Sequence, residues 1–198
     1  MNLYIVRHGN TFDKGDIVTR VGGRTDLPLS ISGREQAKAL SRAFASINLG
    51  ACYSSPLRRT IDTAEAICSP HDLTIKPAEF LREIDYGPDE NKPETQVVVR
   101  LGQKAILDWD EMSKVPNGWN VDPDMYIKAW SDFVTTLTLD NTLVVTSNGV
   151  ARFVIDALDL QVNHRKLLTG SVAKLTRTSG VWSVDYWGLR PPFLTSPK

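Results

Sequence analysis

Two short apolar runs, each ending in a polar turn, constrain this chain more than any other feature. Residues Asn2–Val6 precede Arg7-His8-Gly9, and residues Asn141–Thr146 precede Ser147-Asn148-Gly149. Nearly continuous apolar runs of this length are typical of strands that are buried on both faces of a parallel sheet. Ligands bind at the carboxyl edge of such sheets. We therefore expect the two polar turns to lie together at one edge and to form part of a site.

Helical periodicity separates these strands along the chain. Ser32 and Glu35 form a predicted capping box that opens the first helix. The aromatic stripe of Tyr126, Trp130 and Phe133 is expected to be core rather than a binding surface. Alternating strands and helices predict a three-layer α/β/α sandwich with a mostly parallel central sheet. We expect helices over about 32–46, from Ser54-Ser55-Pro56 with Pro56 in the first turn, near 95–112, over 125–137 and over about 150–160. Further strands are expected at 51–53, 73–75, 172–175 and 181–187.

Composition narrows the function classes. The 198 residues are 41% apolar and 23% charged, with 23 basic and 23 acidic side chains, so the net charge is zero. This balance argues against broad electrostatic binding to nucleic acid or membranes. We expect a single domain over residues 1–198, with a proline-containing, cap-like excursion at about 77–122. The oligomeric state stays open.

The termini and cysteines indicate a cytoplasmic protein. The chain contains no apolar run long enough for a transmembrane helix, and Met1–Asn10 has no basic lead-in and no small-residue cleavage site. Cys52 and Cys68 are the only cysteines. We expect both to be reduced, small buried residues rather than a disulfide framework.

Five motifs, taken in order, carry a family resemblance. They are Arg7-His8-Gly9, the Thr25–Ser30 segment before Gly33, Ser54–Thr60 with its Ser-Pro-Leu-Arg-Arg core, Leu81–Gly87, and Thr146–Val150. In this order and spacing the chain resembles the histidine phosphatase superfamily, in its phosphoglycerate-mutase-like branch, over nearly its whole length. The resemblance implies a phosphoglycerate-mutase-like fold with a mixed sheet, and phosphoryl transfer through a phosphohistidine with no metal or other cofactor.

The residue chemistry agrees with that expectation. A neutral imidazole at His8 has a ring nitrogen with a free lone pair that can attack phosphorus. The guanidinium groups of Arg7 and Arg59 suit phosphoryl oxygens. Glu83 matches the family's acid, and a carboxyl beside a phosphate dianion should have a raised pKa. Asp85 and Glu90 are close enough in sequence to compete with Glu83 for this role.

The turn after the late strand departs from the family pattern. A second catalytic histidine normally stands there, and this chain has Asn148. With an uncharged amide in place of that histidine, we expect the reaction rate to be reduced by about tenfold or somewhat more. Asn148 keeps an N–H donor that can bind phosphate, and a helix cap is a second interpretation that is compatible with this role. His71 and His164 are expected to be surface or structural residues that do not replace the missing histidine.

The loop after His8 supplies further candidate ligands. Asn10 and Thr11 are expected to donate to phosphate or substrate, and Arg20 and Arg24 are candidates for added cationic recognition. Many relatives carry Gly-Glu-Ser where this chain has Gly118-Trp119-Asn120, which changes the pocket mouth. Trp119 would there be either a stacking wall or, as we favour, an ordinary packing residue.

The favoured function is a phosphoric-monoester hydrolase acting on a small-molecule phosphate ester. One alternative is a catalytically impaired phospho-ligand-binding protein, which the missing histidine motivates. The other alternative is a phosphoglycerate-type mutase. It is favoured less because this chain resembles the compact phosphatase branch more closely than the longer glycolytic mutases.

Overall fold

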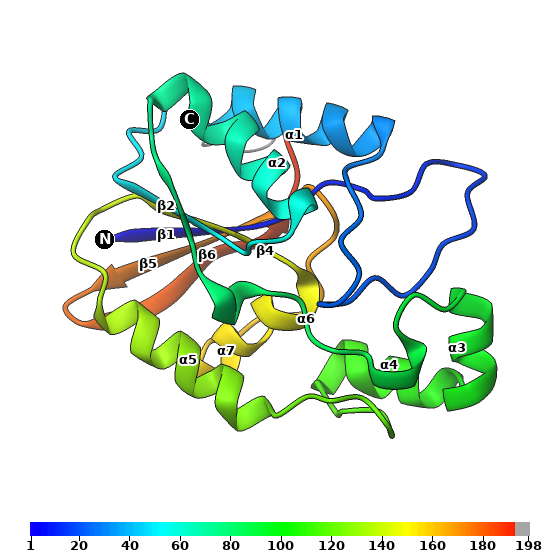
Figure 1. The fold of residues 1–198 in the computed structure, drawn as a ribbon. Helices are drawn as coiled ribbons and strands as arrows, with labels where there is room; N and C mark the ends of the chain where they lie inside the picture. The colour runs from blue at the N-terminus through cyan, green and yellow to red at the C-terminus, as the bar shows by residue number, and fades with distance from the viewer. Residues whose placement is uncertain (193–198) are drawn as a thin grey trace.

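The computed structural model describes residues 1–192 and contains a six-stranded sheet in the order β3-β2-β4-β1-β5-β6 (Figure 1). The first four strands of this order run parallel, and β5 and β6 are antiparallel to their neighbours. The predicted α/β class with a mixed, mostly parallel sheet is therefore confirmed. The strands are β1 (Asn2–Arg7), β2 (Ala51–Ser54), β3 (Ile75–Pro77), β4 (Thr142–Thr146), β5 (Val172–Thr178) and β6 (Val181–Leu189).

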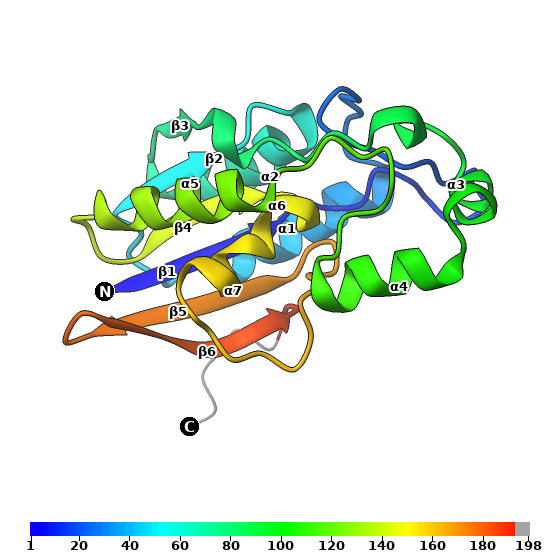
Figure 2. The same ribbon diagram turned by 90° about the horizontal axis from the view of Figure 1, so that it is seen from below.

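Helices cover both faces of the sheet (Figures 1 and 2). The α-helices are α1 (Ile31–Phe44), α2 (Arg58–Cys68), α3 (Glu94–Leu101), α4 (Gln103–Met112), α5 (Pro123–Thr135), α6 (Asn148–Ala151) and α7 (Phe153–Ala157), and the 3₁₀ helices are η1 (Ser69–His71), η2 (Glu79–Leu81) and η3 (Gly87–Asp89).

Alternation along β1 divides the core between two layers. Leu3 and Ile5 belong to the cluster shared with α5 and α7, while Tyr4 and Val6 belong to the cluster shared with α1 and α2. Successive side chains of a strand point to opposite faces, so a continuous apolar run is needed when both faces are covered. Trp130 is fully buried in the first cluster and Tyr126 and Phe133 pack against it, which confirms the predicted aromatic core.

The segments that leave the sheet gather beyond the carboxyl ends of the parallel strands. Figure 1 shows the loop after β1 on one side of this end, and α3 and α4 on the other side. Both helices belong to the segment at 77–122 for which a cap-like excursion is expected. The predicted single helix at 95–112 is wrong, because Gly102, with φ +82°, separates α3 from α4.

The predicted cap of the first helix is also wrong. Ser30 is the N-cap, and its hydroxyl accepts a hydrogen bond from the Gly33 N–H. The carboxylate of Asp13 accepts from the N–H groups of Ile31 and Ser32. A side chain from the preceding loop thus satisfies donors at the helix N-terminus, as termini require.

Several other boundaries move. The predicted helix at 150–160 begins two residues earlier, at Asn148, and divides into α6 and α7 at Arg152. The strand predicted at 73–75 lies at 75–77, where it pairs with β2. Helix α2 begins at Arg58, so Pro56 precedes its first turn instead of lying within it.

Two predictions about buried side chains are confirmed. Trp119 packs edge-on against Tyr86 and Trp109, and its indole N–H donates to Asp89, so it is a packing residue. Cys52 and Cys68 are buried free cysteines. Within residues 1–192, no helix is both long enough and apolar enough to cross a membrane.

The packing of α1 against the sheet predicts a large cost for Leu40→Ala. Leu40 is fully buried, whereas Leu107 on α4 is 46% exposed. Truncating a buried leucine costs about 2–5 kcal/mol, and truncating a half-exposed one costs much less. Urea unfolding should show this loss for Leu40→Ala and a change below about 1 kcal/mol for Leu107→Ala. Equal losses in the two variants would contradict the layer assignment.

Candidate active site

The four parallel strands bring the candidate site residues together at their carboxyl ends. Arg7 ends β1 and His8 follows it, Asn148 follows β4, Arg59 lies in the first turn of α2 after β2, and Glu83 comes after β3 and η2. Arg7 is paired with Thr146 in the β1–β4 register, which confirms that the two polar turns share one sheet edge. A cavity of about 390 Å³ opens there, and Arg7, His8, Glu83 and Asn148 line it.

The His8 ring is buried and held in one orientation. Its Nδ1–H donates to the Gly9 carbonyl at 2.7 Å, which leaves Nε2 as the acceptor nitrogen. Arg59 Nε lies 3.3 Å from Nε2 and donates to it. Burial, together with the positive charges of Arg59 and Arg7, holds the pKa of His8 well below its usual value of 6.5. His8 is therefore a neutral imidazole at physiological pH.

Close backbone packing fixes the chain on either side of the ring. A Cβ at position 9 would lie 2.4 Å from the Gly33 carbonyl oxygen, so only glycine fits this approach to the first turn of α1. The Gly9 N–H donates to the Thr63 hydroxyl of α2. The segment that carries His8 is thus held between the two helices of one layer.

Arg59 and Arg7 keep part of their donor capacity free. Arg59 is fully buried, and its two Nη atoms donate to the carbonyls of Thr25 and Gly22. Arg7 Nη1 donates to the Leu167 carbonyl at 2.7 Å, and among residues 1–192 its buried Nε has no partner. A guanidinium has five N–H donors, so each arginine retains hydrogens for a bound anion.

Glu83 is a buried carboxyl group in the same cavity. Its Oε1 accepts from the Ile84 N–H, and its Oε2 accepts from the Gly149 N–H. A Cβ at position 149 would lie 2.2 Å from Oε1, so a larger residue in the turn after β4 would displace the Glu83 carboxylate. Burial raises the pKa of Glu83, and the two N–H groups and the arginines oppose this only in part.

The competing carboxylates serve the structure instead. Asp85 pairs with Arg24 at 2.9 Å and accepts from the Asn120 amide. Glu90 accepts from the Thr25 hydroxyl and from the N–H of Arg24. Neither lines the cavity that contains His8.

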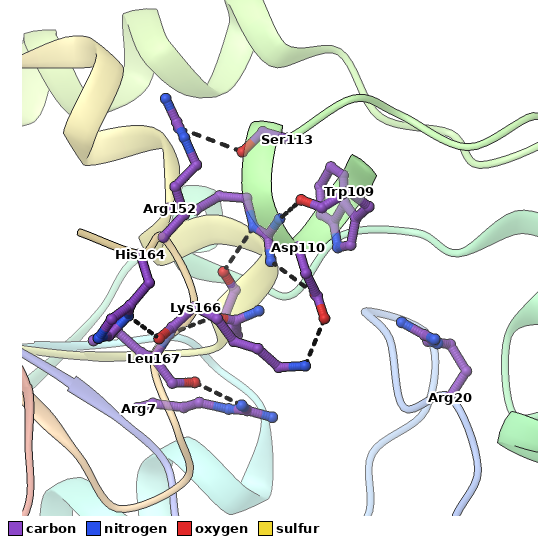
Figure 3. Close-up of polar contacts among 12 residues, drawn as sticks. Arg7, Arg20, Trp109, Asp110, Ser113, Arg152, His164, Lys166 and Leu167 are labelled. Atoms are coloured by element: carbon purple, nitrogen blue, oxygen red, sulfur yellow. Dashed lines mark hydrogen bonds and ion pairs between the residues drawn. The ribbon is translucent and has the colours of Figure 1, made fainter. Parts of the chain in front are cut away.

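Asn148 does not cap a helix. It is the first residue of α6, and its side-chain oxygen accepts a hydrogen bond from the Leu167 N–H at 2.8 Å. Because an N–H group can pair only with the oxygen of the amide, the Nδ2 donor is left for the cavity. The same residue, Leu167, accepts the bond from Arg7 (Figure 3).

The four candidate residues in the loop after β1 differ in their contacts and in whether they line the cavity. Asn10 lines the cavity, but its amide donates to the Ser32 hydroxyl and accepts from Thr169. Thr11 also lines the cavity and is half-buried. Arg20 lines the outer cavity, whereas Arg24 is 59% exposed and lies outside it.

Sequence reasoning missed the groups on two other segments. Asp110 of α4 and Lys166 line the cavity. The main chain of Leu167 is hydrogen-bonded to two side chains of the cavity, Arg7 and Asn148. Fully buried Arg152 donates to the carbonyls of Trp109 and Asn148. The signal available for Arg152 was its position four residues after Asn148. No comparable signal marked Lys166 or Leu167. Within the described residues, no group of histidine, cysteine and acidic side chains is placed to hold a metal ion.

Comparison with known proteins agrees with this geometry. The family model of the histidine phosphatase superfamily, branch 1, matches residues 3–190. A probable phosphoglycerate mutase, GpmB, of Yersinia pestis is 30% identical over 120 residues, which are 60% of this chain but only 55% of that protein. The alignment thus spans about half the length of the curated relatives.

Solved structures share the fold over almost the whole chain. A mycobacterial glucosyl-3-phosphoglycerate phosphatase, solved with inorganic phosphate, superposes with a TM-score of 0.76 at 22% identity, covering 96% of this chain and 97% of that one. YhfR of Bacillus stearothermophilus superposes with a TM-score of 0.74 at 25% identity, covering 94% and 96%. With the family model covering nearly every residue, the chain belongs to branch 1 of the histidine phosphatase superfamily.

Proposed function

We propose that this protein is a phosphoric-monoester hydrolase that acts through a phosphohistidine at His8. The observation that carries the proposal is the His8 ring, whose Nδ1–H is bonded to the Gly9 carbonyl while the lone pair of Nε2 accepts from Arg59 Nε–H, a bond that an entering phosphoryl group would replace. A buried neutral imidazole oriented in this way is a nucleophile placed next to an anion-binding group.

In the first step, Nε2 attacks phosphorus, an N–P bond forms, and the bond from phosphorus to the leaving oxygen breaks. Glu83 gives its proton to that oxygen, for which its raised pKa suits it. In the second step, Glu83 as a carboxylate takes a proton from water, the water oxygen bonds to phosphorus, and the N–P bond breaks. The products are the alcohol and inorganic phosphate.

The phosphoryl oxygens would be held by the free donors of Arg7, Arg59 and Asn148. Charge develops on these oxygens during transfer, and fixed donors stabilise it without reorganising. Asn10 and Thr11 are assigned a lesser part at the edge of the phosphoryl site, because the Asn10 amide already has partners in Ser32 and Thr169.

The first test is trapping of the intermediate during hydrolysis of 4-nitrophenyl phosphate. We expect phosphorylated His8 in rapidly quenched samples analysed by mass spectrometry at alkaline pH, and a fall in rate of at least about 1,000-fold in His8→Ala. Exposed His164 offers a matched control, and His164→Ala should keep the activity. A wild-type rate equal to that of His8→Ala would favour the binding protein, and phosphoryl return to an alcohol that needs a bisphosphate primer would favour the mutase.

The acid role of Glu83 predicts a pH dependence. Because its pKa is raised, hydrolysis of an alkyl phosphate should fall as the pH rises through that value and the proton is lost, while the requirement for neutral His8 limits the rate only below pH 6.5. Glu83→Gln should remove the alkaline fall and lower kcat/KM for alkyl esters far more than for 4-nitrophenyl phosphate, whose leaving group needs no proton. The comparison uses kcat/KM because it reports the first step, before Glu83 acts as the base. Exposed Glu79 provides the matched control Glu79→Gln, and an unchanged profile in Glu83→Gln would refute the assignment.

We propose that Asn148 donates to the phosphoryl group as a neutral amide, and that the neighbouring Leu167 N–H favours a neutral side chain at this position. A histidine at this position would present Nδ1 to the Leu167 N–H, which must be met by an acceptor. A protonated ring has no acceptor nitrogen, so this contact opposes the charged form. Replacing Asn148 with histidine would thus add bulk without adding the positive charge that the family's second histidine supplies.

We therefore expect Asn148→His to raise kcat/KM by less than about threefold, instead of the tenfold gain that a charged donor would bring. Asn148→Asp keeps the bond from Leu167 but turns the donor into a repelling oxygen, so it should cost about a hundredfold or more. Steady-state hydrolysis of 4-nitrophenyl phosphate measures both effects. A tenfold gain in Asn148→His would show that the Leu167 contact does not limit the charge at this position.

A further inference from the structure

The outer half of the cavity is separate from the phosphoryl-binding groups. Arg7, His8, Glu83 and Asn148 lie at the sheet edge, whereas the mouth is formed by the loop after β1, by α3 and α4, and by the segment before β5. With phosphorus at His8, the leaving alcohol of a substrate would occupy this outer half. The chemistry of the mouth therefore selects the alcohol.

The charges at the mouth are balanced in pairs. Arg20 Nη2 lies 2.6 Å from the Glu94 carboxylate, and Lys166 Nζ lies 2.7 Å from the Asp110 carboxylate. All four side chains line the cavity, and Figure 3 shows Asp110 and Lys166 in contact, with Arg20 on the facing loop. Both carboxylates come from the excursion at 77–122, and both cations come from other segments.

Asp110 has a second cation behind it. Arg152 Nη2 is 3.8 Å from Asp110, and Arg152 is fully buried. Lys166 and Arg152 thereby hold the Asp110 carboxylate at the mouth from two sides. If Asp110 moved away from Lys166, its ion pair with buried Arg152 would also weaken. A carboxylate or second phosphate on the alcohol would meet Asp110 and Glu94 as like charges, and the cations beside them, Lys166 and Arg20, are already paired with these carboxylates.

Neutral hydroxyl groups meet a more favourable surface. The carboxylates can accept from hydroxyl hydrogens, and Arg20, which lines the cavity and uses Nη2 for Glu94, has further N–H donors for a hydroxyl oxygen. Arg20 is fixed in place, with its guanidinium 5.2 Å from the ring centres of both Tyr86 and Trp119. The remaining wall offers apolar contact for carbon-bound hydrogens, from Phe12, Val18, Ile106 and Trp109.

We propose that the substrate is the phosphate ester of a neutral polyhydroxylated alcohol, such as a sugar or polyol, and that Asp110 and Glu94 select against alcohols that carry a carboxylate or a second phosphate. This inference rests on the proposed hydrolase function. It distinguishes this chain from an enzyme specialised for phosphoglycerate, whose alcohol bears a carboxylate.

The test uses matched substrates that differ only in CH₂OH against COO⁻. The pairs are glucose 1-phosphate with glucuronic acid 1-phosphate, and glycerol 3-phosphate with 3-phosphoglycerate. We expect the neutral member of each pair to have a kcat/KM at least about tenfold higher, a difference typical of one unpaired like charge near a site. Hydrolysis of 4-nitrophenyl phosphate, measured beside them, reports whether the proposed function itself holds.

Two variants locate the selection. Asp110→Asn and Glu94→Gln should each raise kcat/KM for the acidic members by about threefold or more, because Lys166 or Arg20 becomes a free cation. Asp132→Asn removes a comparable lysine pair, with Lys128 at 2.6 Å, on α5 and outside the cavity, so it should leave the ratio unchanged. Glu94 lies at the start of α3 and is 36% exposed, so its variant tests the inference even if Asp110→Asn fails to fold.

The outcomes are separable. If the wild-type protein does not hydrolyse 4-nitrophenyl phosphate, the function on which this inference rests is overturned. If that hydrolysis is present, the inference is overturned by preference for the acidic members, by an unchanged ratio in the folded variants, or by failure to hydrolyse any of the four esters.

Discussion

The parallel pairing of β1 with β4 is the constraint on which the rest of the structure depends. It places Arg7 beside Thr146, and the His8 N–H continues the pairing by donating to the Thr146 carbonyl. Two polar turns that are about 140 residues apart in sequence thus begin at the same edge. Both strands are apolar on both faces, and a slip of one residue would exchange the side chains that the two core layers receive from each strand.

Burial at this edge gives the site its chemistry. His8, Arg59 and Glu83 are nearly or fully removed from solvent. Burial disfavours the charged forms of both His8 and Glu83, so the pKa of the imidazole is lowered and the pKa of the carboxyl is raised. The nearby arginines lower the pKa of His8 further and oppose the shift of Glu83 only in part. In the proposed function, one environment thereby prepares the nucleophile and the acid of the first step.

The Leu167 main chain connects the phosphoryl-binding groups to the mouth. Its N–H orients Asn148, its carbonyl holds Arg7, and the preceding residue, Lys166, pairs with Asp110 of the excursion. Because these contacts lie on consecutive residues, a change in the contacts of the excursion at 77–122 would also affect Arg7 and Asn148. In the proposed function, the selection of the alcohol and the placement of the phosphoryl donors would therefore depend on the same segment.

The sequence by itself determined most of the strands, the sheet class and the polar turns, because hydrophobic periodicity is a local property of a chain. The candidates His8, Arg7, Arg59 and Glu83 came from short motifs and from the family resemblance that those motifs carry. The sequence failed where a distant group decided the outcome, as when Asp13 took the donors at the start of α1. Only the tertiary structure decided the orientation of Asn148 and the charge pairs at the mouth. The physical reason is that a main-chain N–H such as that of Leu167 is present in almost every residue, and an ion pair such as Asp110–Lys166 joins segments 56 residues apart, so neither leaves a pattern in the sequence.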